Sequence, residues 1–226
     1  MKKVLVIAPH QDDEIIGAGG LICHMLSIGN SVEVCHVFSG TSGIMDVDDP
    51  AESARIRHDE ARAAAKLGGY NLLDNLGFTD RDRTGYAGVQ DALIRLIRQQ
   101  RPDIIVLPHE AESDAEHHLV SACGTQASWL SASNIFNELG SPLHKTLEVL
   151  YYEVWQPIKK PDYVLDISEY ADMKQQLLEC FPSQMKSTSW VEGALGLNAY
   201  RGTTLQTKGY AEVYETATTD LKRILT

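Results

Sequence analysis

The chain has 226 residues, 43% of them hydrophobic, and a formal net charge of -11 at pH 7. This length fits one α/β domain spanning residues 1–226, and the acidic charge argues against nucleic acid or an anionic membrane as the main partner, because both reward a basic face. No apolar run approaches the roughly 18 residues that a membrane span needs, and the four widely spaced cysteines favour a cytoplasmic protein over a disulfide framework.

The apolar pattern predicts five strands that alternate with helices, as repeated βα units require. The predicted strands cover residues 3–8, 31–38, 72–76, 103–107 and 147–155. The predicted helices cover residues 14–28, 51–67, 90–100, 119–136 and 167–180, and a mixed tail follows. This order predicts a Rossmann-like, doubly wound and mostly parallel sheet with helices on both faces.

Three glycines, Gly17, Gly19 and Gly20, fall in the first turns of the first predicted helix. Their spacing differs from the Gly-x-Gly-x-x-Gly of dinucleotide sites, and they lie inside the helix rather than before it. We therefore expect close packing of this helix on the sheet instead of a nucleotide site.

Residues 9–14 read Pro-His-Gln-Asp-Asp-Glu directly after the first predicted strand. The carboxyl ends of parallel strands are where open α/β sheets hold their ligands. An imidazole and a carboxylate are typical zinc ligands, and a neighbouring carboxylate is free to handle protons. The motif therefore predicts a zinc hydrolase in which His10 and Asp13 provide two ligands from one short turn.

A second cluster of ligand types follows the fourth predicted strand. A catalytic zinc usually takes three protein ligands and keeps one position open for water. Residues 109–118 read His-Glu-Ala-Glu-Ser-Asp-Ala-Glu-His-His, and no other segment has this density of ligand types. We expect the third ligand from this segment, and the residue types alone leave open which histidine it is.

The two motifs resemble those of the LmbE-like, or PIG-L, deacetylases, which are zinc-dependent N-deacetylases of N-acetylglucosamine derivatives. Further matching stretches are spread along most of the chain, at Arg57-x-x-Glu60, at 76–80 and 152–155, and at Ser183-Gln184. The resemblance implies the fold predicted above and one zinc ion per chain bound by His10 and Asp13. It also implies that Asp12 is the general base that deprotonates the bound water.

The second family motif commonly reads His-x-Asp-His, and here residues 114–117 read Asp-Ala-Glu-His. The resemblance makes His117 the third zinc ligand and places Asp114 where the family has a histidine that stabilises the oxyanion. An aspartate has the wrong charge for that task. Three alternatives follow. The alignment with the family motif is shifted by one residue, so that His118 binds the metal; His109 takes the place of the family's oxyanion-stabilising histidine; or zinc alone polarises the carbonyl.

Two further residues are candidates for contact with a sugar. Arg57 lies one helical turn before Glu60, so a structural salt bridge competes with a bond to a sugar hydroxyl. Asp80 resembles the acidic residue that follows the third strand in the family, with a plain loop aspartate as the alternative.

These observations predict a hydrolase that removes the N-acetyl group from an N-acetylglucosamine-type amino sugar or its conjugate, a small molecule. The sequence is compatible with a homo-oligomer, and the ligand types fit iron as well as zinc. One alternative is a metal amidase for a different N-acyl substrate. The loops at 41–52 and 80–89 would decide between these two substrate classes. Another is a catalytically weak sugar- or zinc-binding homologue in which Asp114 has removed the oxyanion donor.

Overall fold

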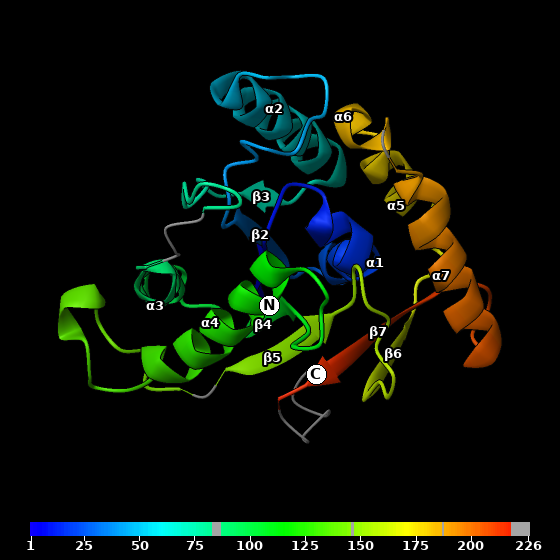
Figure 1. The fold of residues 1–226 in the computed structure, drawn as a ribbon. Coiled ribbons are helices and arrows are strands. Elements are labelled where there is room, and N and C mark those ends of the chain that lie inside the picture. Colours follow the sequence, from blue (N-terminus) through cyan, green and yellow to red (C-terminus); the bar gives the residue numbers. More distant parts are fainter. Residues whose placement is uncertain (83–86, 146, 187, 218–226) are drawn as a thin grey trace.

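A seven-stranded sheet forms the centre of the computed structural model, which describes residues 1–82, 87–145, 147–186 and 188–217 (Figure 1). Its strands are β1 Lys3–Ala8, β2 Ser31–His36, β3 Asn71–Leu72, β4 Ile104–Pro108, β5 Glu148–Tyr152, β6 Tyr163–Asp166 and β7 Ala211–Thr216. The order across the sheet is β3-β2-β1-β4-β5-β7-β6. The first five are parallel, and β7 runs antiparallel to both β5 and β6. The predicted mostly parallel, doubly wound sheet is confirmed.

Helices cover both faces of the sheet (Figure 1). They are α1 Asp13–Ser27, α2 Pro50–Gly68, α3 Val89–Gln100, α4 Ala115–Ser131, α5 Ala171–Leu178, α6 Pro182–Met185 and α7 Trp190–Thr204, with a short 3-10 turn at Asn137–Leu139. None of the helices in the described ranges is long and apolar enough to cross a membrane.

Strand β1 shows why both faces need a cover. Successive side chains of a strand point to opposite faces, and here Val4 and Val6 join the core formed with α1, α2, α5 and α7. Leu5 and Ile7 join the other core, formed with α3 and α4. All four are buried, as expected for a central parallel strand.

The chain departs from the sequence prediction mainly in its last third. Strand β6 was not predicted, and it lies between the predicted strand 147–155 and the predicted helix 167–180. Strand β7 and helices α6 and α7 were not predicted either, and they make up the expected mixed tail. Helix α4 begins four residues before the predicted 119–136, because Asp114 caps it there. The predicted strand 72–76 is shorter in the structure, where β3 spans only Asn71–Leu72. The N–H groups of Leu73 and Leu76 still donate to carbonyls of β2.

The glycines of α1 allow the close packing that their position predicts. A Cβ atom on Gly17 would lie 2.1 Å from the ring of Tyr152, and one on Gly20 would lie 2.4 Å from Cγ2 of Ile167. Real Cβ atoms do not approach other atoms this closely. Only glycine lets α1 lie this near to β5 and to the start of α5.

Helix α1 is also broken at Ala18, whose φ of -139° is not helical. A buried ion pair satisfies the backbone groups that this break releases. Lys174 Nζ donates to the carbonyl of Ile16 at 2.8 Å, and Glu212 accepts from the N–H groups of residues 20 and 21 at 2.8 Å each. Lys174 and Glu212 lie 2.7 Å apart. The first turn of α1 therefore has its own direction, fixed by residues of α5 and β7.

Candidate active site

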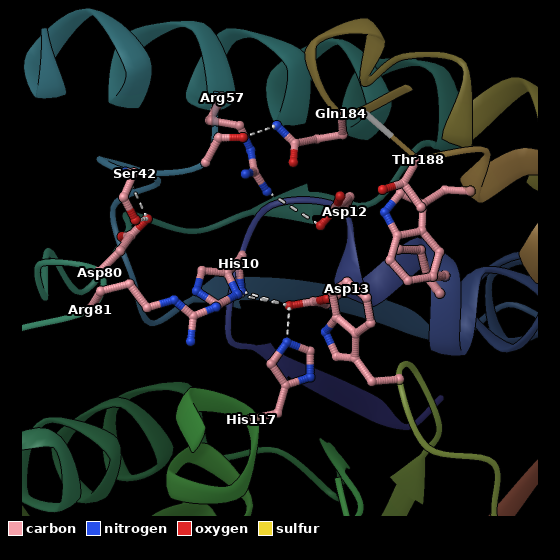
Figure 2. A pocket seen from close by; sticks show the side chains of 14 residues that line it. His10, Asp12, Asp13, Ser42, Arg57, Asp80, Arg81, His117, Gln184 and Thr188 are labelled. Carbon is pink, nitrogen blue, oxygen red and sulfur yellow. Dashed lines mark hydrogen bonds and ion pairs between the residues drawn. The ribbon is translucent and has the colours of Figure 1, made fainter. Parts of the chain in front are cut away.

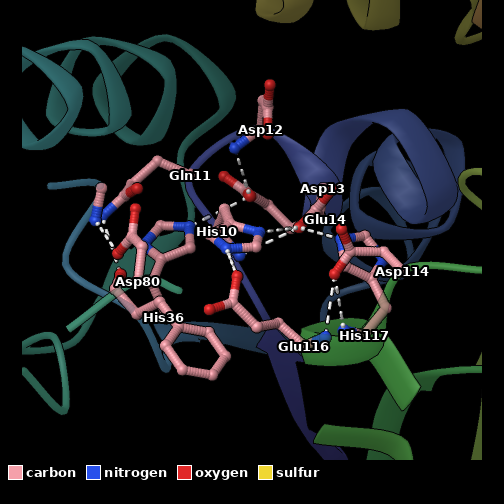
Figure 3. A network of polar contacts seen from close by, with 12 residues as sticks. His10, Gln11, Asp12, Asp13, Glu14, His36, Asp80, Asp114, Glu116 and His117 are labelled. Atoms are coloured by element: carbon pink, nitrogen blue, oxygen red, sulfur yellow. Dashed lines mark hydrogen bonds and ion pairs between the residues drawn. The ribbon is translucent and has the colours of Figure 1, made fainter. Parts of the chain in front are cut away.

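The turn between β1 and α1 is held in a strained conformation. Asp12 has a φ of 123°, a region that residues with a side chain rarely adopt. Its N–H donates to Glu14 Oε2 at 3.1 Å, and the N–H of His10 donates to Asp13 Oδ2 at 2.9 Å. Glu14 is itself fixed by His36, whose ring nitrogen lies 3.0 Å away. This network presents His10 and Asp13 at the edge of the sheet (Figure 3).

The structure brings His117 to this turn. Asp13 Oδ2 lies 3.4 Å from His10 Nδ1 and 3.2 Å from His117 Nε2. The three potential ligand atoms all lie within 4.8 Å of one another. Two atoms bound to a tetrahedral zinc ion lie roughly 3.3–3.5 Å apart. The donor set and these separations therefore fit zinc, whereas the exposed His118 bonds to the carbonyl of Glu110 instead.

Two glutamates, Glu112 and Glu116, lie beside the rings of the two histidines, and the sequence had suggested no role for either. His10 Nε2 lies 2.8 Å from Glu116 Oε2, and the buried His117 Nδ1 has no hydrogen bond but lies 3.8 Å from Glu112 Oε2. A metal-binding histidine usually donates its other N–H to a carboxylate, which fixes the tautomer and the ring. The acidic residue directly before His117 was the available signal for Glu116.

The charges within the cluster shift the pKa values of its own residues. Burial lowers the pKa of His10, but hydrogen bonds to Asp13 and Glu116 outweigh it and raise that pKa to about 9. Burial would raise the pKa of Asp13, yet the neighbouring His117 and His10 hold it far below its usual range. Carboxylates thus dominate the surroundings of both rings, and such surroundings favour a bound cation.

Asp12 is next to the cluster without being part of it (Figure 2). Arg57 Nη2 lies 3.3 Å from Asp12 Oδ1, and the same nitrogen donates to the carbonyl of Gln11. Burial raises the pKa of Asp12 to about 7, against the opposing charge of Arg57. A carboxyl with such a pKa exchanges a proton near neutral pH, as a general base requires.

The two residues expected near a sugar both line the cavity beside this cluster. Arg57 makes no ion pair with Glu60, because Glu60 accepts from the N–H and hydroxyl of Ser183 at 2.7 and 2.6 Å. The salt bridge considered between them is therefore not formed. Asp80 accepts from the N–H groups of Gly40 and Ser42 at 2.8 and 3.2 Å, which ties the loop after β2 to the loop after β3.

Asp114 and His109 are not among the residues that line this cavity. Asp114 caps α4 by accepting from the N–H groups of Glu116 and His117 at 2.8 and 3.4 Å. The buried His109 has its Nε2 2.6 Å from the carbonyl of Gln156. Because neither residue lines the cavity, the structure does not support a direct catalytic role for Asp114 or His109.

Arg81 lines the cavity, and Asp114 holds it there. Its guanidinium donates two bonds to Asp114, at 2.6 and 3.1 Å, and its Nε lies 3.3 Å from Glu116 Oε2. Hydrogen bonds from Arg81 overcome the effect of burial and keep the pKa of Asp114 below its usual value. Asp114, at the position where the resemblance places a histidine, thus binds an arginine from another loop beside the site.

The cavity has a volume of about 160 Å³. Ser42, Asp80 and Arg81 lie on one side of the histidine cluster, and Thr188 lies on the opposite side (Figure 2). The apolar lining consists of Ile16, Trp155 and Trp190. The two tryptophan rings pack edge to face with centroids 4.8 Å apart.

Known proteins resemble the chain over most of its length. The diacetylchitobiose deacetylase of Thermococcus kodakarensis is 27% identical over 198 residues, which are 84% of this chain and 73% of that protein. The solved N,N'-diacetylchitobiose deacetylase of Pyrococcus horikoshii has a TM-score of 0.84 at 24% identity, covering 95% of this chain and 83% of its own. The 4-carboxy-2-hydroxymuconate hydratase GalB of Pseudomonas putida has a TM-score of 0.85 at 20% identity, covering 98% of each chain.

The fold alone therefore does not fix the reaction, since a deacetylase and a hydratase share it. The family model described as PIG-L, GlcNAc-PI de-N-acetylase, matches residues 5–128. This segment is more than half of the chain and contains His10, Asp13 and His117. The protein belongs to the PIG-L family.

Proposed function

We propose that this protein is a metal-dependent hydrolase that removes the N-acetyl group from an N-acetylglucosamine-type amino sugar or its conjugate. The observation that carries the proposal is the convergence of His10, Asp13 and His117 beside Asp12, a buried carboxyl outside the ligand set. The similarity to a diacetylchitobiose deacetylase supports the choice of substrate.

One zinc ion per chain is the proposed cofactor, held by His10, Asp13 and His117. Two imidazoles and one carboxylate leave a fourth position open, as in other catalytic zinc sites. When bound, the ion supplies a water of lowered pKa and polarises the acyl carbonyl. The ring contact between His10 and Glu116 would keep Nδ1 of His10 unprotonated and directed at the metal.

Asp12 is proposed to move the proton. Its carboxylate takes a proton from the attacking water and then transfers it to the departing amine nitrogen. Arg57, 3.3 Å away, holds the carboxylate in place. A pKa of about 7 suits both steps, because the group must accept the proton and then release it.

We assign the stabilisation of negative charge on the acyl oxygen to Arg81 as well as to the metal. Arg81 lines the cavity, and its guanidinium is fixed by Asp114 and Glu116. This assignment replaces the direct roles considered for Asp114 and His109. Arg57, Asp80 and Ser42 also line the cavity, and they offer donors and acceptors to sugar hydroxyls.

Metal content and amine release together test the proposal. The wild type should contain about one zinc per chain and release amine from N-acetylglucosamine or N,N'-diacetylchitobiose. His117→Ala should lose both the metal and the activity, whereas Asp12→Asn should keep the metal and lose the activity. Zinc in the wild type without amine release would support a binding homologue. Retained zinc in His117→Ala would refute the ligand set.

A further inference from the structure

A second cavity of about 130 Å³ adjoins the first one. Ile16 and Trp190 line both cavities, so the second one continues the apolar side of the site. Most of its other wall is also apolar and comes from Val154, Ala194 and Leu197. It lies between α1, β7 and α7, and the mechanism proposed above does not use it.

The polar groups in this lining are largely occupied by the protein itself. Glu153 is paired with Arg201 at 2.7 Å, and Glu212 with Lys174 at 2.7 Å. Asn198 donates to the carbonyl of Ala211 at 3.0 Å, and its Oδ1 is buried without a partner. The cavity therefore offers apolar surface and a single unsatisfied acceptor, which suits an alkyl chain better than a sugar.

The placement of the lining residues suggests an orientation for an amide substrate. The hydroxyls of an amino sugar need hydrogen-bonding partners, and Ser42 and Asp80 offer them on the side of the histidine cluster opposite Thr188 (Figure 2). With the scissile carbonyl at the histidine cluster, the acyl carbon chain then extends toward Ile16 and Trp190. The second cavity lies next along that direction.

Resting on the proposed function, we propose that the second cavity is an acyl subsite. It takes the alkyl end of N-acyl groups longer than acetyl, so that the substrates are amino sugars with short linear acyl chains. Gly193 of α7 is exposed and lines this cavity, and a Cβ atom on it would meet no atom within 4 Å.

A chain-length series tests this subsite. We would measure kcat/KM for N-acetyl-, N-propionyl-, N-butyryl- and N-hexanoylglucosamine on the wild-type protein. Each methylene buried should raise kcat/KM about fourfold, the equivalent of about 0.8 kcal/mol. A steady fall from acetyl to propionyl to butyryl would overturn the acyl subsite and leave the deacetylase intact. Release of amine from no member, acetyl included, would refute the proposed function and the subsite with it.

A matched pair of variants on α7 tests whether the alkyl chain binds in the second cavity. Gly193 lines the second cavity and Gly196 does not, and a Cβ at either position meets no atom within 4 Å. Gly193→Leu should lower the ratio of butyryl to acetyl kcat/KM about fifteenfold, because its side chain would take the space that two methylenes occupy in the wild type. Gly196→Leu should keep the wild-type ratio. An unchanged ratio in Gly193→Leu would place the alkyl chain elsewhere and overturn the proposal.

Discussion

Replacing Arg81 by alanine separates the arginine's role from that of the metal. The side chain is 53% exposed, and its ion pairs are with Asp114 and Glu116. The two carboxylates are only 15% and 0% exposed, but the guanidinium is open to solvent, which screens both pairs, so we expect their loss to lower the free energy of unfolding by about 1 kcal/mol. The substitution should therefore leave the protein folded, so that a change in rate can be attributed to the site.

The expected loss is in kcat. Removing one donor from an oxyanion site costs roughly 2.7–4 kcal/mol, which is about 10²–10³-fold in kcat. KM should change little, because the charge on the acyl oxygen develops only in the transition state. Millimolar guanidinium should restore part of the lost rate, since the vacated place is open to the cavity.

Arg55→Ala is the matched control. Arg55 is 60% exposed and, like Arg81, pairs with two carboxylates, Glu52 at 2.7 Å and Asp59 at 2.9 Å. It does not line the cavity. The assay is amine release over a range of substrate concentrations, with zinc content measured on each variant, because Glu116 also contacts His10. A kcat within threefold of the wild type in fully metallated Arg81→Ala would show that the metal alone polarises the carbonyl.

Three further changes have distinct expected results. Asp114→His should lower the free energy of unfolding by about 1 kcal/mol through loss of the α4 cap, and should lower kcat because Arg81 loses its partner; a rise in kcat would support decayed activity instead. Lys174→Met should destabilise by about 3–5 kcal/mol in urea unfolding, because it leaves Glu212 buried without its cation; a change below about 1 kcal/mol would contradict this. Chelation should lower the melting temperature and added zinc should restore it. His118→Ala should respond in the same way as the wild type. A melting temperature that changes with neither treatment would argue against a metal site.

The parts of the site that are local in sequence were predictable. His10, Asp12 and Asp13 share one turn after a strand whose apolar run is unmistakable. The alternation of strands and helices then implies that the loop holding His117 reaches the same edge of the sheet. The choice between His117 and His118 needed the start of α4, which the position of Asp114 determines.

The parts that depend on contacts between distant segments were not predictable. Arg81 showed no motif of its own, and its significance comes from Asp114, 33 residues later in the chain. Strands β6 and β7 are short and half-exposed in places, so their apolar pattern did not stand out from the neighbouring residues. The second cavity needs α7, which was not predicted either.

The broken first helix has a consequence for how the protein is made. The turn with His10 and Asp13 is synthesised well before β7, yet the N–H of Gly20 is satisfied by Glu212, 192 residues later. At about 5–20 residues per second, the ribosome needs roughly 10–40 s to bridge that separation. Contacts this distant along the chain form late, because their loop-closure entropy must be overcome first. We therefore expect the proposed metal site to be completed only at the end of folding, although His10, Asp13 and His117 are all synthesised before Glu212.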